Sequence, residues 1–271
     1  MRKSCRTMTN WLALTLLGAL VLTGWDCSVS LPPTNQAHIR ANVRLKEEVL
    51  PPYASRRFYT IENNETANFL VLKIEPALWS WGLAEDPAKP KSVAAWREAS
   101  GATAVLNAAY FTESGEPSGY WKNTPTVPVS AISWPKKGSG YTGTVMIKDG
   151  ALALAYLPSD APDPAKSDAI FLTFPTLIAD GRPLVEKETG LKSRRTALAE
   201  DQSGTDYIII TEEGIVSLHQ FSRWLSEQPE RFTRAVNLDG GPSTGLSLKD
   251  GGEALEIPSA PVPNVLLLRR R

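Results

Sequence analysis

The sequence predicts an α+β fold, a single domain rich in mixed or antiparallel sheet with only a few helices. Many short segments with alternating or β-branched apolar residues follow one another along the chain. The chain also contains 21 proline and 19 glycine residues, which is more than a helical bundle would tolerate. No β-α-β unit is repeated, so a regular parallel sheet is not expected.

The predicted strands come in an order typical of a sheet-rich domain. Residues 148–151, Lys-Asp-Gly-Ala, form a predicted hairpin turn between two of them. The expected strands cover residues 58–61, 68–74, 103–107, 129–134, 144–148, 152–156, 169–174, 207–211, 235–238, 244–248 and 264–268.

Two segments are predicted to be helical. Residues 92–100 form the first, which stops at Gly101, a common residue just after a helix. The second begins at Ser217, where Ser217 and Gln220 match a capping box. Its apolar residues at positions 218, 221, 224 and 225 share one face, and Pro229 lies beyond its end.

The N-terminus has the pattern of an export segment. Basic residues at positions 2, 3 and 6 precede an apolar run over 11–25. This run is shorter than the roughly 20 residues that span a bilayer. We therefore expect residues 1–30 to be a signal peptide or N-terminal anchor, residues 31–56 a linker, and residues 57–271 the folded domain. Lipidation at Cys27 is an alternative, although Asp26 rather than a small residue precedes it.

Composition excludes several kinds of function. The formal net charge is +0, which gives no general attraction to nucleic acid or to an anionic membrane. Contact with a membrane is therefore expected only through the N-terminal segment. The two cysteines, Cys5 and Cys27, both lie in that segment, so the folded part has no thiolate nucleophile, disulfide or cysteine metal site.

The segment "RAVNLDGGPSTGL", residues 234–246, is the strongest candidate for a functional site. Asp239 would follow a buried strand, and Gly240, Gly241 and Ser243 would surround it with free amides and a hydroxyl. Such a cradle suits a phosphate or sugar oxygen. The alternative is a plain hairpin joining residues 235–238 to 244–248. The other Asp-Gly pairs, at 149, 180 and 250, lack this cradle and are predicted to be simple turns.

Other segments supply polar groups that could join Asp239. Asn107 ends a predicted strand and is followed by a loop with Glu113 and Glu116. Arg194 or Arg195 could bind a phosphate, because a guanidinium engages two oxygens at once. Tyr110 and Phe111, by contrast, are interpreted as core residues.

No cofactor is expected, because no acidic cluster has the spacing of a metal site. A Ca²⁺ site built from Asp239, Asn237 and loop carbonyls is the alternative.

Together these segments resemble the phosphodiester glycosidase family, over roughly residues 57–271. "NLDGGPS" at 237–243 is similar to the family's "NLDGGGS" signature, and "NAAYF" at 107–111 to its "NAGYF" element. Ala109 and Pro242 stand where the family often has glycine. The remaining matches follow the family's order and lie at 174–181, 195–197, 218–227 and 262–266.

The resemblance implies hydrolysis of a glycosyl phosphodiester at the anomeric carbon of the sugar. Asp239 would be the catalytic carboxylate, and Glu113 would be a second carboxylate. Asn107 and Asn237 would orient Asp239 or the sugar hydroxyls. Arg195 would bind the phosphate.

Ser243 and the amides of Gly240 and Gly241 would assist Arg195. The expected substrate is a phosphate-linked sugar or polysaccharide of a surface or extracellular glycan, which an exported periplasmic or extracellular enzyme would meet. The alternative function is a non-catalytic envelope module that binds glycans through the same cleft.

Overall fold

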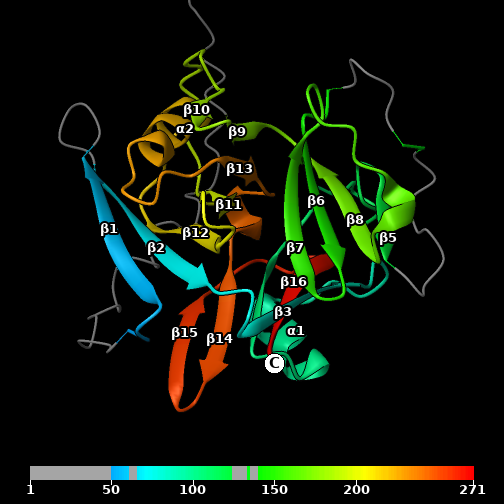
Figure 1. Cartoon of the computed structure of the whole chain (residues 1–271). Helices are drawn as coiled ribbons and strands as arrows, with labels where there is room; N and C mark the ends of the chain where they lie inside the picture. Colours follow the sequence, from blue (N-terminus) through cyan, green and yellow to red (C-terminus); the bar gives the residue numbers. More distant parts are fainter. Residues whose placement is uncertain (1–49, 61–65, 124–132, 135–139) are drawn as a thin grey trace, which may run out of the picture. The chain divides into compact units, whose positions relative to one another are not determined.

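The computed structural model describes residues 50–60, 66–123, 133–134 and 140–271 (Figure 1). The chain divides into two compact units, Met1–Glu48 and Val49–Arg271, and the described residues belong to the second. The predicted export segment over 1–30 therefore lies outside the described residues. Within the described part of the chain, no helix is both long enough and apolar enough to cross a membrane.

The folded unit starts earlier than the predicted boundary at residue 57. Tyr53 packs edge-to-face on Trp79 with ring centroids 5.6 Å apart, and its hydroxyl donates to Asp250 Oδ2 at 2.7 Å. These contacts tie the end of the predicted linker into the sheets, and the first strand begins at Ala54.

Three antiparallel sheets make up the unit, so the structure confirms the sheet-rich α+β class in its antiparallel form. The seven-stranded sheet has the order β1-β2-β12-β11-β13-β9-β10. Its strands are β1 (Ala54–Thr60), β2 (Thr66–Ile74), β9 (Thr176–Ala179), β10 (Arg182–Pro183), β11 (Thr196–Glu200), β12 (Asp206–Glu213) and β13 (Arg234–Asn237).

Two smaller sheets complete the architecture (Figure 1). The five-stranded sheet has the order β15-β14-β4-β16-β3, and the four-stranded sheet has the order β5-β8-β6-β7. The strands of the five-stranded sheet are β3 (Trp79–Glu85), β4 (Ala104–Asn107), β14 (Leu246–Asp250), β15 (Glu253–Ile257) and β16 (Asn264–Arg270). The strands of the four-stranded sheet are β5 (Trp121–Asn123), β6 (Gly143–Lys148), β7 (Ala151–Tyr156) and β8 (Ala169–Thr173).

One hydrophobic core is shared by all three sheets, and strand periodicity places the side chains in it. In β12, Ile208 and Ile210 face this shared core, whereas Tyr207 and Ile209 face a second cluster that includes Phe221. Successive residues of a strand point to opposite faces, which gives this division. The interior strand β12 is therefore apolar on both faces.

The two helices are confirmed close to their predicted positions. α1 (Val93–Ser100) is capped by Ser92 and ends at Gly101, whose φ of 62° is left-handed. α2 (Leu218–Ser226) begins with the predicted capping box of Ser217 and Gln220. Each helix covers an outer sheet face, α1 on the five-stranded sheet and α2 on the seven-stranded sheet.

The predicted simple turns are also confirmed. Asp149 and Gly150 have φ values of 51° and 74°, and Asp180 and Gly181 have φ values of 49° and 74°, as in type I′ hairpins. The segment after Asp250 turns through Gly251 and Gly252 between β14 and β15.

The hairpin alternative for the Asp239 segment is wrong. β13 belongs to the seven-stranded sheet, whereas β14 belongs to the five-stranded sheet. The residues between these two strands therefore cross from one sheet to the other.

Candidate functional site

The crossing segment, residues 238–245, is held by hydrogen bonds to both sheets. Leu238 N donates to Thr196 O at 2.9 Å, on the seven-stranded side. Asp239 N donates to Ala108 O at 3.1 Å, just after β4 of the five-stranded sheet. Within the segment, the short 3₁₀ turn Gly241–Ser243 requires a φ of 60° at Gly241, a conformation that favours glycine. The loop is therefore fixed by backbone contacts rather than being a free connection.

Asn107 is the main side-chain link between the two sheets. Its Nδ2 donates to Asp239 O at 2.6 Å, and its Oδ1 accepts from Thr196 Oγ1 at 2.9 Å and from Gly245 N at 3.2 Å. The side chain is fully buried, and both lone pairs of its oxygen are used by the protein. The structure thus places Asn107 where it orients the Asp239 loop, with no acceptor left for a sugar hydroxyl.

The Asp239 carboxylate lies half-buried at the start of this loop. Its Oδ1 accepts from Gly240 N at 2.8 Å, and the Ser243 hydroxyl forms a second hydrogen bond with the carboxylate. Burial raises the pKa of Asp239, and the hydrogen bonds from Ser243 and Gly240 lower it in part. Among the described residues, no cationic side chain lies within ion-pair distance of this carboxylate.

Asn237, at the end of β13, is also buried beneath the loop. Its Nδ2 donates to Tyr110 Oη at 2.5 Å and to Phe174 O at 3.1 Å, and its backbone carbonyl accepts from the Thr173 hydroxyl. Its Oδ1 has no hydrogen-bond donor among the described residues. Since buried acceptors are normally satisfied, this oxygen is suited to bind a ligand hydroxyl.

Arg195 lies beside Gly240. A Cβ placed on Gly240 would be 3.7 Å from Arg195 Nη1 and only 2.9 Å from Arg194 O, so a larger residue would press on the Arg194 backbone. Arg195 donates through Nε to Val216 O at 3.1 Å and through Nη2 to Leu191 O at 2.9 Å. Burial lowers its pKa, and no carboxylate in the described ranges forms an ion pair with it.

Tyr110 shows that these charged groups share one neighbourhood. Burial is the main reason that its pKa is raised; the Asp239 charge raises it further and the Arg195 charge lowers it. The phenol therefore lies within electrostatic range of both groups. Sequence reasoning placed Tyr110 in the core, although its position three residues after Asn107 could have associated it with the site.

The structure brings together most of the predicted site, namely Asn107, Arg195, Asn237, Asp239, Gly240, Gly241 and Ser243. Glu113 is placed differently. It is exposed in a turn closed by hydrogen bonds between Thr112 and Glu116, and no contact among the described residues joins it to the cluster. Phe174 begins a segment that matches the family but was not assigned to the site; the residue is 47% exposed, and its carbonyl accepts a hydrogen bond from Asn237.

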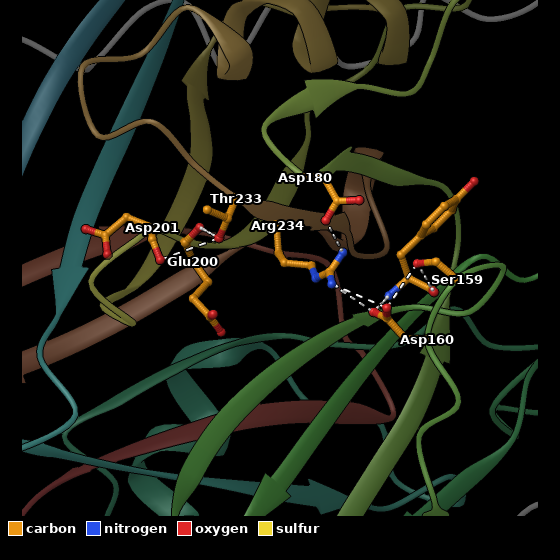
Figure 2. Close-up of polar contacts among 8 residues, drawn as sticks. Ser159, Asp160, Asp180, Glu200, Asp201, Thr233 and Arg234 are labelled. Carbon is orange, nitrogen blue, oxygen red and sulfur yellow. Dashed lines mark hydrogen bonds and ion pairs between the residues drawn. The ribbon is translucent and has the colours of Figure 1, made fainter.

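A second polar cluster occupies the opposite end of β13. Arg234 Nη2 lies 3.2 Å from Asp160 Oδ2, and its Nη1 lies 3.5 Å from Asp180 Oδ1. Figure 2 shows the Arg234 guanidinium reaching toward these two aspartates. Since both ends of this cation meet a carboxylate, the positive charge of Arg234 is compensated within the protein.

Within the described part of the chain, no group of three or more histidine, cysteine, aspartate or glutamate side chains is placed to hold a metal ion. A surface hollow of about 610 Å³, lined by Tyr53, Trp79 and Arg270 among others, contains none of the predicted site residues. Arg270 in this hollow is paired with Asp250 at 2.5 Å and stacks on Trp79, so its charge is already used.

Comparison with solved structures agrees with the fold. The zebrafish N-acetylglucosamine-1-phosphodiester alpha-N-acetylglucosaminidase catalytic domain, auto-inhibited by its pro-peptide, is 17% identical with a TM-score of 0.60; the alignment covers 82% of this chain and 85% of that one. A hypothetical protein from Synechocystis is 15% identical with a TM-score of 0.51, over 80% of this chain and 62% of that one.

At these identities, the structural matches establish the fold alone. No curated protein matches the sequence. The sequence model of the family described as phosphodiester glycosidase matches residues 100–269, a span that runs from just before β4 into the last strand and includes every residue of the Asp239 cluster. The chain therefore belongs to the phosphodiester glycosidase family.

Proposed function

We propose that this protein is an exported hydrolase that cleaves a glycosyl phosphodiester, the sugar-phosphate linkage of a surface or extracellular glycan. The observation that carries the proposal is the pair of uncompensated charges around Tyr110. Asp239 and Arg195 are both partly buried, and neither has an ion-pair partner among the described residues. Such charges are costly to bury unless a ligand completes the site.

Arg195 supplies the binding site for the phosphate. Two of its nitrogens are fixed by the carbonyls of Val216 and Leu191, which orients the guanidinium, while Nη1 beside Gly240 makes no hydrogen bond to a described residue. An orientated guanidinium binds anionic oxygens strongly. The buried Oδ1 of Asn237 is an acceptor for a hydroxyl of the sugar.

Asp239 supplies the carboxylate that the reaction needs. When the bond between the anomeric carbon and the phosphate oxygen breaks, its electron pair leaves with the phosphate monoester and positive charge develops on the sugar ring. A carboxylate stabilises this charge or takes a proton from the attacking water. The hydrogen bonds from Gly240 N and Ser243 fix its position. The proposed reaction does not use the exposed side chain of Glu113.

The sequence of the first 30 residues supports the export part of the proposal. Its basic start and apolar run have the pattern of a secretion segment, and an exported enzyme would meet phosphate-linked surface glycans.

Substitution of Asp239 by asparagine tests the proposal. Asparagine keeps the acceptor for Gly240 N but removes the charge, so we expect turnover of sugar-1-phosphodiesters to fall about 10²–10⁴-fold. Because burial raises the Asp239 pKa, stability should be unchanged or higher at neutral pH. The Asp149→Asn variant makes the same change in a simple turn and should keep full activity.

Two results would contradict the proposal. Undiminished turnover by the Asp239→Asn variant would remove this carboxylate from the reaction. Saturable glycan binding by the wild-type protein, without product over long incubation, would instead indicate the non-catalytic glycan-binding module.

A further inference from the structure

The Tyr110 hydroxyl is a polar group of the site that the proposed reaction has not used. It lies three residues beyond the end of β4 and meets the end of β13 through the 2.5 Å hydrogen bond from Asn237 Nδ2. Tyr110 is only partly buried, so part of the residue remains accessible to solvent.

Hydrogen-bond accounting fixes the direction of the Tyr110 proton. A backbone carbonyl can only accept, so the Asn237 atom that meets Phe174 O at 3.1 Å must be the amide nitrogen. The same nitrogen donates to Tyr110 Oη, which makes the phenol oxygen an acceptor in that bond. The Tyr110 hydroxyl therefore does not donate to Asn237, and no other acceptor for its proton is found among the described residues.

The surroundings of Tyr110 suggest which ligand atom this proton faces. Its hydroxyl binds Asn237, two residues before Asp239, and Gly240, directly after Asp239, lies beside Arg195. Both charges influence the phenol, so the hydroxyl lies near the carboxylate and near the guanidinium proposed to bind phosphate. In a bound phosphodiester, the atom that joins the sugar carbon near Asp239 to the phosphate near Arg195 is the bridging oxygen. Burial raises the pKa of Tyr110, so the hydroxyl keeps its proton at neutral pH.

We propose that Tyr110 is a further catalytic residue, whose hydroxyl donates a hydrogen bond to the departing phosphate oxygen. This inference rests on the proposed function. As the bond to the anomeric carbon breaks, its electron pair moves onto that oxygen, and the fixed donor stabilises the growing negative charge. Tyr110 keeps its proton throughout; water supplies the hydroxyl group that the sugar gains. A donor whose bond strengthens only as charge develops raises kcat rather than substrate affinity.

The Tyr110→Phe variant tests this inference, because it removes one oxygen and leaves the ring. We expect kcat on a sugar-1-phosphodiester to fall about 10²-fold, as when one oxyanion donor is lost, with KM changed less than threefold. Inhibition by a simple phosphate monoester such as glycerol phosphate should weaken about tenfold, whereas inhibition by the free sugar should not change. The Tyr207→Phe variant is the control, since it removes a phenol that donates to Asp201 outside the site.

The outcomes separate this inference from the proposed function. A Tyr110→Phe enzyme with kcat within threefold of wild type overturns the inference while the hydrolase function stands. Equal losses of phosphate-monoester and sugar binding, together with a lower Tm, also overturn it by showing a structural role. If the wild-type protein turns over no phosphodiester, the proposed function fails, and unchanged glycerol phosphate binding by the variant would reject the donor role as well.

If the Tyr110→Phe variant does not fold, a second replacement at the same position tests the inference. Incorporation of 3-fluorotyrosine at position 110 keeps the hydrogen bond from Asn237 and makes the hydroxyl a stronger donor. Glycerol phosphate should then bind more tightly than to wild type, and unchanged or weaker binding would overturn the inference.

Discussion

The two ends of strand β13 carry polar groups of similar kind in very different states. At its start, Arg234 forms ion pairs with Asp160 and Asp180, so its positive charge is compensated within the protein (Figure 2). Past its end, Asp239 has no cation and Arg195 has no carboxylate within ion-pair distance among the described residues. Arg234 is the first residue of this four-residue strand, and Asp239 lies two positions past its end.

This difference indicates which cluster serves structure and which serves a ligand. A partly exposed ion pair contributes little to stability, but it leaves no charge unsatisfied. A partly buried charge without a partner raises the free energy of the folded protein until a ligand binds. The cluster around Asp239 is therefore the one expected to change on substrate binding.

Replacing the two arginines by alanine is the strongest test of this comparison. We expect Arg195→Ala to lower kcat/KM for a phosphodiester about 100-fold, because a charged hydrogen bond to the phosphate worth about 3 kcal/mol is lost. Arg234→Ala should leave kcat/KM unchanged and lower the free energy of unfolding by about 1 kcal/mol or less. Steady-state kinetics and urea unfolding measure both effects, and an activity loss only in the Arg234 variant would reverse the assignment.

Asn107→Ala should have the next largest effect, mainly on stability. It leaves the Thr196 hydroxyl, Gly245 N and Asp239 O without their partner, so we expect a loss of about 3 kcal/mol in the free energy of unfolding. The folded fraction should also show a lower kcat, because the Asp239 backbone is no longer held. A variant as stable as wild type would show that the backbone contacts alone fix the loop.

Asp206 sharpens the comparison, because it is a buried carboxylate outside the site that pairs with no cation in the part of the chain that the structure describes. Burial raises the pKa of Asp206 to about 7, although Trp81 Nε1 donates to it at 2.9 Å. The folded state thus holds a proton that the unfolded chain loses near pH 4, so stability falls as pH rises from 4 to 7, by up to about 1.4 kcal/mol for each pH unit.

The Asp206→Asn variant tests the predicted pH dependence of stability. The difference in unfolding free energy between the two proteins should grow from pH 5 to pH 7, while activity at a given pH stays the same. A difference that does not change with pH would show that Asp206 is ionised throughout.

Glu113→Gln should have the smallest effect. Its side chain is exposed and has no contact with the Asp239 cluster among the described residues, so kcat and KM should stay within about twofold of wild type, as for surface changes of about 0.5 kcal/mol. A loss of 100-fold or more would instead support the role of Glu113 as the second carboxylate of the reaction.

Much of the fold could be predicted from local patterns. The capping box at Ser217, the glycine after α1 and the Asp-Gly turns are set by neighbouring residues, and each is found where the sequence placed it. Strand β11, "TALAE", was not predicted, because alanine, leucine and glutamate favour helices. Its position between β12 and β13 overrides that preference, since both of its neighbours supply a complete ladder of hydrogen bonds.

The candidate site was predicted as a set of residues but not as an arrangement. Motif order indicated Asp239, Arg195 and the two asparagines, and the structure brings these residues into one cluster. A linear pattern could not show that the side-chain oxygen of Asn107 already accepts two hydrogen bonds within the protein. Nor could it show that Tyr110 is close to both charges. Both facts depend on two sheets meeting, which no local window contains.

The position of the crossing segment has a consequence for how this protein can vary. The backbone of Asp239 is bonded by residues 107 and 108, so the position of the carboxylate depends on the alignment of two separate sheets. A slide of one sheet against the other by a fraction of an ångström would move the reacting group before it disturbed the core. Mutations deep in either sheet could therefore alter turnover while the melting temperature hardly changed.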